Sequence, residues 1–141
     1  MLTVANGDRA LETLRVDVRA CLDALLQRAP ALRFACVGTA DGRLLAHASR
    51  DGAAGGERIA AMTSSMLALA ESFARDALQG RCNYSVVSTP AGSIVVVRVP
   101  HRARAYMFSA GSDGSEVLAS TLRAALDAAG KIAAIAGQAA A

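Results

Sequence analysis

Residues 32–48 read LRFACVGTADGRLLAHA, which are two short apolar runs on either side of an Asp-Gly pair. The first run covers 32–39, the second covers 43–48, and Ala-Asp-Gly at 40–42 separates them. A tight turn between antiparallel strands needs residues that tolerate a positive φ, and Asp-Gly is a favoured pair at that position. The stretch therefore predicts a β-hairpin.

Three further strands are expected in the second half of the chain. Residues 81–88 alternate in polarity, as a strand with two different faces does. Residues 93–99 (SIVVVRV) are nearly continuously apolar, which is typical of a central strand covered on both faces. Turn sequences at 89–92 and 100–104 flank this segment, and 105–110 (AYMFSA) is the fifth strand.

Amphipathic helices are expected before, between and after these strands. The first covers about 8–28, carries apolar residues at three- and four-residue spacing, and stops at Pro30. The second covers about 57–78 and is closed by Gly80. The third opens in a capping box at Asp113. Its inner face is expected to comprise Leu118, Leu122, Leu126 and Ala129.

A chain of 141 residues fits a single domain. We expect this domain to cover residues 1–132, with Gly130 ending or fraying the last helix and 133–141 forming an alanine-rich C-terminal tail without a packing signal. The element order is then αββαβββα, and the short hairpin connections make the sheet antiparallel. The fold class is α+β.

The helix expected over 57–78 has two faces of different character. One stripe is large and apolar and is expected to face the core: Ile59, Met62, Met66, Leu69 and Phe73. The neighbouring stripe is made of smaller residues: Ala60, Thr63, Leu67, Ala70 and Ala74. This second stripe is open to two interpretations, close packing on the sheet or contact with another helix. We favour contact with another helix, because one helix cannot easily bury both stripes on one sheet.

The sequence offers little catalytic chemistry. Cys82 with His47 or His101 could form a nucleophile and base, but no flanking motif supports the pair, so Cys82 is expected to be a core residue and His47 a partly exposed strand residue. The glycine-rich stretches 52–56 and 111–115 lack phosphate-loop and dinucleotide spacing and are expected to be loops with caps. Metal-ligand spacing is absent. We predict no catalytic, cofactor or metal site, and a protein that is not an enzyme.

The charge pattern excludes several partners. The net charge is +3, but the arginines are scattered, and their tightest group, Arg98, Arg102 and Arg104, has no interleaved aromatics. Nucleic-acid binding is therefore not expected. No apolar run approaches the ~20 residues that span a bilayer, and charges between Arg9 and Arg19 replace a secretory apolar core. With three widely spaced cysteines, we expect a cytoplasmic protein without a membrane partner.

The element order and four segments resemble the Roadblock / dynein light chain family over about residues 10–132. The segments are DGRLLAHASRDG (41–52), GERIAAMTSSMLALAESFARDAL (56–78), SIVVVRV (93–99) and SDGSEVLASTLRAALDAA (112–129). The resemblance implies a profilin-like sheet in the strand order 2-1-5-4-3. It places the first and third helices on one face and the second on the other. The Arg-for-Lys bias suits a bacterial single-domain member.

The resemblance also implies a homodimer in which the third strands pair edge to edge and the second helices pack together. The strand residues expected there are Asn83, Tyr84, Ser85 and Val86. The helix residues expected to meet a partner are Ala60, Thr63, Ser64, Leu67, Ala68, Ala70, Glu71 and Ala74. Bacterial members of the family are associated with Ras-like small GTPases.

These inferences predict a dimeric regulator or scaffold that binds a Ras-like small GTPase and modulates its GTP hydrolysis or localisation. The alternative is a structural dimerisation module of a larger complex, without effect on GTPase activity. A small-molecule sensor is a third, less favoured interpretation, because few polar groups converge within the apolar segments.

Overall fold

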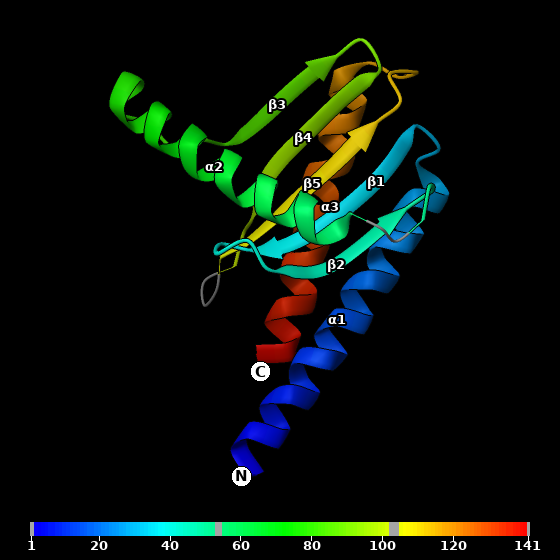
Figure 1. Cartoon of the computed structure of the whole chain (residues 1–141), viewed down its shortest axis with the longest axis vertical. Helices are drawn as coiled ribbons and strands as arrows, with labels where there is room; N and C mark the ends of the chain where they lie inside the picture. Colours follow the sequence, from blue (N-terminus) through cyan, green and yellow to red (C-terminus); the bar gives the residue numbers. More distant parts are fainter. Residues whose placement is uncertain (1, 53–54, 102–104, 141) are drawn as a thin grey trace.

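A computed structural model describes residues 2–52, 55–101 and 105–140 (Figure 1). The elements are α1 (Leu2–Arg28), β1 (Leu32–Thr39), β2 (Leu44–Ser49), α2 (Gly56–Leu78), β3 (Tyr84–Thr89), β4 (Gly92–Val99), β5 (Tyr106–Ser112) and α3 (Leu118–Ala140). The strands form one antiparallel sheet in the order β2-β1-β5-β4-β3. The predicted element order, α+β class and strand order are confirmed.

Helices cover both faces of the sheet. Figure 1 shows α1 and α3 on one face and α2 crossing the other. The larger apolar core lies between the sheet and the α1–α3 pair, and its fully buried members include Leu22, Phe108 and Ile132. A smaller cluster lies under α2, where Leu67 packs with Val96 and Met107. The larger core therefore holds α1 and α3, and α2 rests on few large side chains.

The predicted hairpin at 32–48 is present. Gly42 has φ 85°, and its amide donates a hydrogen bond to the Thr39 carbonyl at 3.0 Å, which closes the turn. The register shifts between Val37 and Gly38, so a bulge interrupts the β1–β2 ladder near the turn.

Helix α1 ends at Arg28, as the sequence predicts. Arg50 directly follows β2, and its guanidinium donates hydrogen bonds to carbonyls at the end of α1, those of Ala29 at 3.1 Å and of Leu26. The same side chain donates to the Leu32 carbonyl at 2.6 Å. A cation therefore neutralises the negative end of the α1 dipole.

Helix α3 differs from its prediction in its start and in its buried face. It begins at Leu118, and Asp113 instead accepts a hydrogen bond from the Ser115 amide at 2.9 Å in the preceding turn. Leu118 and Leu126 are 43% and 47% exposed. The buried face consists of small residues and one isoleucine: Thr121, Ala125, Ala128, Ala129, Ile132 and Ala136. The prediction followed the leucines, whereas the helix packs closely through its alanines.

Helix α3 also continues through the segment that was expected to be a tail. Gly130 does not end it, and the helix runs to Ala140, with Ala136 4% exposed. Because alanine has the highest helix propensity, this alanine-rich sequence extends the helix once one face has a surface to pack on. Helix α2 ends just before Gly80, as the sequence predicts. The residue with the left-handed backbone conformation at this end is Gln79, with φ 55°.

The reactivity of the Cys36 thiol measures whether α2 stays packed on the sheet. Cys36 is 1% exposed on β1, and burial raises the pKa of its thiol to about 12. Because the thiolate is the reactive form, we expect iodoacetamide at about pH 8 to leave Cys36 unmodified in the folded protein and to modify it after unfolding. Peptide mass spectrometry measures this. Rapid modification of Cys36 in the folded protein would show that α2 opens away from the sheet.

Candidate interaction surface

Helix α2 is only half supported by its own sheet. Its buried residues all lie at or before Leu67: Gly56, Ala60, Thr63, Ser64 and Leu67. Its remaining turns extend past β3, at the edge of the sheet (Figure 1). Residues 68–78 are all exposed or half-buried. In the C-terminal half of α2, only one side is partly covered by the described residues of this chain, and no residue is fully buried.

The smaller residues of α2 face the sheet because helix and sheet approach closely there. A Cβ atom placed on Gly38 of β1 would lie 3.1 Å from the Cβ of Ala60. The Thr63 hydroxyl donates a hydrogen bond to the Ser109 hydroxyl of β5 at 2.9 Å, and both residues are buried. Large side chains have no room in this contact. The expectation that the larger apolar stripe faces the core is therefore wrong for Met62, Leu69 and Phe73.

Three members of that larger stripe point to solvent instead, whereas Ile59 is half-buried and Met66 packs in part against the Leu67 cluster. Met62, Leu69 and Phe73 are 56%, 72% and 71% exposed, and Met66 is half-buried between them. Their spacing of four, three and four residues places them along one side of the helix. We call Met62, Met66, Leu69 and Phe73 the α2 stripe. Exposed apolar stripes of this kind mark interaction surfaces.

The α2 residues predicted to meet a partner fall into different environments. Four are buried against the chain's own sheet: Ala60, Thr63, Ser64 and Leu67. Ala70 and Ala74 are half-buried, and Ala68 is exposed. Glu71 is half-buried and accepts a hydrogen bond from Nε of Arg98 on β4 at 3.0 Å, which ties the projecting part of α2 to the sheet. Of the predicted set, Ala68 alone is classed as exposed.

The sequence did contain a signal for the α2 stripe. Periodicity separates the two stripes, but the size of an apolar side chain does not by itself indicate burial. The glycine at position 38 and the serine at position 109 lie on strands beneath α2 and are small, like the α2 residues they meet. Small residues on both surfaces indicate close approach of helix and sheet, which leaves the large side chains outside.

The β3 edge lies below the projecting half of α2. Among the described residues β3 pairs with β4 alone, so its outer edge has unpaired backbone groups. Tyr84 is 44% exposed, Ser85 and Val86 are half-buried, and Asn83 is exposed just before the strand. The four predicted strand residues are thus at this edge, next to the C-terminal half of α2.

The potential catalytic groups do not form one site with His47. His47 is on β2 and Cys82 precedes β3, and these strands are opposite edges of the sheet. Four strand spacings of about 4.8 Å separate such edges, which is too far for a nucleophile and its base. His47 is 5% exposed, so the expectation of partial exposure is wrong. The His101 ring packs on Tyr106 with centroids 5.9 Å apart.

The remaining sequence candidates also have structural roles. Gly55 precedes α2 with φ 92° and no side-chain cap, and the rest of its loop includes 53–54, which lie outside the described residues. In the second glycine-rich stretch, Gly111 belongs to β5. Of the basic group, Arg98 pairs with Glu71, and 102–104 lie outside the described residues.

Two kinds of site are not found in the part of the chain that the structure describes. No group of three or more His, Cys, Asp or Glu side chains is placed to hold a metal ion. No described helix has both the length and the apolar character needed to cross a bilayer.

The family model of the Roadblock/LC7 domain matches residues 20–103. A structure described as MglB with tetrameric arrangement superposes with a TM-score of 0.76 at 19% identity, covering 89% of this chain and 92% of that one. Myxococcus xanthus MglB gives 0.76 at 14% identity, covering 89% and 91%. A Roadblock/LC7 domain from Streptomyces avermitilis gives 0.72 at 15%, covering 81% and 92%. No curated protein matches the sequence.

Proposed function

Because the chain belongs to the Roadblock/LC7 domain family, we propose that it is a cytoplasmic homodimer that binds a Ras-like small GTPase and modulates its GTP hydrolysis or localisation. In this role it is a regulator and supplies no active site of its own. The observation that carries the proposal is the α2 stripe on a helix that projects past an open sheet edge.

A two-fold dimer accounts for both features at once. If the β3 strands of two copies pair, the projecting half of each α2 extends over the sheet of the other copy. That sheet carries half-buried apolar residues, Val87 and Ile94, on the strands nearest the edge. The α2 stripe and these residues would then be buried together, and the unpaired β3 backbone groups would be satisfied. A self-complementary contact of this kind favours a homodimer.

The GTPase part of the proposal rests on the family and on the composite surface of the two α2 helices. Ala68 lies about 100° around the helix from Leu69, so it is exposed on a different side from the α2 stripe. We expect Ala68→Arg to leave the dimer and its thermal stability intact and to prevent GTPase binding, because a long charged side chain blocks the contact. Light scattering and titration against the GTPase in its GDP- and GTP-bound forms measure the two effects.

Two outcomes would contradict the predicted GTPase contact at Ala68. A stable Ala68→Arg dimer with unchanged GTPase binding would place the contact elsewhere. Loss of the dimer would place Ala68 in the seam between the helices. The alternative function, a scaffold without effect on hydrolysis, is distinguished by the GTP turnover of the partner. A scaffold binds the GTPase and leaves its turnover unchanged, whereas a regulator changes it.

A further inference from the structure

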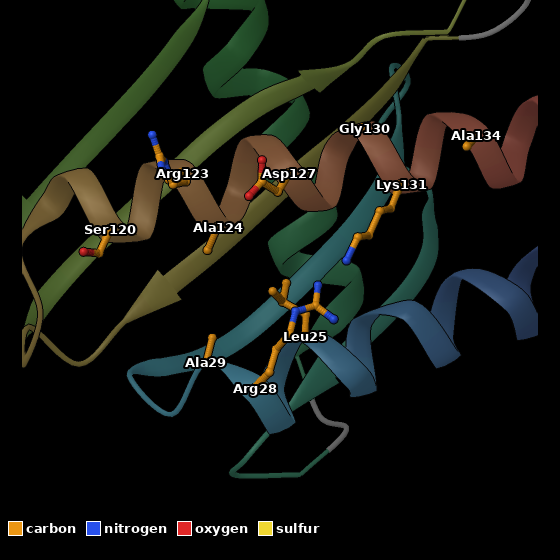
Figure 2. Close-up of a pocket in the computed structure, with 10 residues that line it drawn as sticks. All are labelled: Leu25, Arg28, Ala29, Ser120, Arg123, Ala124, Asp127, Gly130, Lys131 and Ala134. Carbon is orange, nitrogen blue, oxygen red and sulfur yellow. The ribbon is translucent and has the colours of Figure 1, made fainter.

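A second surface lies on the opposite face of the sheet, between the end of α1 and residues 120–134 of α3. The two helices border an open groove of about 660 Å³. Leu25 and Ala29 line it from α1, and small residues of α3, including Ala124, Gly130 and Ala134, line it from the other side (Figure 2). We call this surface the α1–α3 groove. Its lining combines small apolar residues with charged and polar side chains.

The charge facing this groove is positive. Figure 2 shows Arg28 of α1 and Lys131 of α3 extending toward one another across it. Among the described residues, neither is within 4.0 Å of a carboxylate oxygen as an ion pair. Arg123 and Asp127 also line the groove, and because Asp127 is four residues from both Arg123 and Lys131, its single negative charge offsets only part of the three positive charges.

Two further observations support a positive potential there. The Arg50 guanidinium adds a positive charge at the same helix end, where it donates hydrogen bonds to the carbonyls of Leu26 and Ala29. The half-buried Cys21 thiol, one turn before Leu25, is influenced by the groove's cations. Burial raises the pKa of Cys21, and the charges of Arg28 and Lys131 oppose that increase. The two cations therefore act on the same volume between the helices.

The shape and chemistry select among anionic partners. A concave groove does not fit the flat surface of a membrane, and no aromatic side chain lines it for a base to stack on. Most of its lining side chains are exposed, whereas a small molecule needs a pocket that encloses it. A polypeptide segment fits better, because its apolar side chains can rest on the alanines while its carboxylates meet the two cations.

We propose that the α1–α3 groove binds a short acidic segment of a partner protein. Because the groove lies on the face opposite α2, both partners could occupy one dimer. This surface would let the protein connect a GTPase to a second component. Binding of the segment depends only on the charges and shape of the groove, whereas the link to a GTPase rests on the proposed function.

Two helical glycines of α3 provide a matched test. A Cβ atom placed on Gly130 or on Gly137 meets nothing within 4 Å, and Gly130 lines the groove whereas Gly137 does not. Both glycines are within α3, Gly130 in its middle and Gly137 in its last turn, and glycine has a lower helix propensity than glutamate. Gly130→Glu puts a carboxylate into the groove, and Gly137→Glu adds the same charge to the same helix outside it. Lys131→Glu is a second groove variant that reverses a charge.

The probe is a library of random peptides displayed on phage, selected on the immobilised wild-type dimer. We expect the selected peptides to carry clustered Asp or Glu among apolar residues and to weaken as salt is added. Gly130→Glu and Lys131→Glu should each bind them at least about tenfold more weakly, because a like charge now repels the segment. Gly137→Glu should bind them as the wild type does. Circular dichroism confirms that all variants fold.

Other results would overturn the proposal. These are a failure to select any peptide, selected peptides that are not acidic, or acidic peptides that bind Gly130→Glu and Lys131→Glu as tightly as the wild type. Binding to duplex DNA or to phosphatidylserine vesicles that these two variants abolish would likewise assign the groove to another class of partner. GTPase titration of the same variants keeps the two surfaces distinct, since the groove variants should bind the GTPase normally.

Discussion

Leu69→Glu is expected to convert the dimer into a folded monomer. The Leu69 side chain is 72% exposed in the single chain, so a carboxylate there costs the monomer little. In the proposed dimer the same position lies among apolar side chains of both copies, where a charge has no partner and must lose its hydration. We expect the dimer dissociation constant to rise at least about a hundredfold.

Light scattering at about tens of micromolar measures the change, with the wild type expected to be dimeric at that concentration. Val117→Glu is the matched control, because Val117 is 71% exposed but lies before α3, away from the α2 stripe. It should remain dimeric. If Leu69→Glu also remains dimeric, or if the wild type is a monomer, the α2 stripe is not the dimer contact and the proposed arrangement fails.

Gly92→Ala is expected to lower the free energy of unfolding strongly. Gly92 begins β4 with φ 140°, a conformation that side chains disfavour. A Cβ atom placed there would lie 1.9 Å from the carbonyl oxygen of Ser112 and 2.8 Å from its carbonyl carbon. Both atoms are backbone at the end of β5, the central strand of the sheet, so relieving the clash requires a backbone shift. We expect the free energy of unfolding to fall by more than about 4 kcal/mol.

Gly52→Ala separates the two causes. Gly52 also has a positive φ, 106°, but a Cβ atom on it meets nothing within 4 Å. It should therefore lose only about 1 kcal/mol, the cost of the backbone conformation. Urea unfolding of both variants measures the difference. Equal losses would mean that the sheet relieves the clash by a small shift at Ser112.

The two stripes of α2 contact different surfaces. The helix binds its own sheet through small residues, and a hydroxyl pair between Thr63 and Ser109 fixes its position. The large side chains are then available to a partner, next to an edge strand that also lacks one. This arrangement explains why a short chain with little catalytic chemistry places Leu69 and Phe73 in solvent when alone.

Local sequence determined the elements. The Asp-Gly turn at 41–42 needs a positive φ, which Gly42 supplies, so the first hairpin follows from short-range conformational preference. The continuous apolar run at 93–99 similarly predicted a strand covered on both faces, and Val95, Val96 and Val97 are all buried. The strand order came from the family resemblance, because local pattern does not specify which strands are neighbours.

Tertiary structure alone decided which side of each helix is buried. Periodicity shows that α2 has two stripes and that α3 has a leucine side, but it does not measure the distance between a helix and the surface it meets. Close approach at Gly38 admits alanine, threonine and serine of α2 and keeps out methionine and phenylalanine. The same physical cause buries Ala125 and Ala128 of α3 while Leu118 and Leu126 stay exposed. Packing distance depends on residues far apart in the chain, so the interaction surface emerges only when the helix and the sheet are brought together.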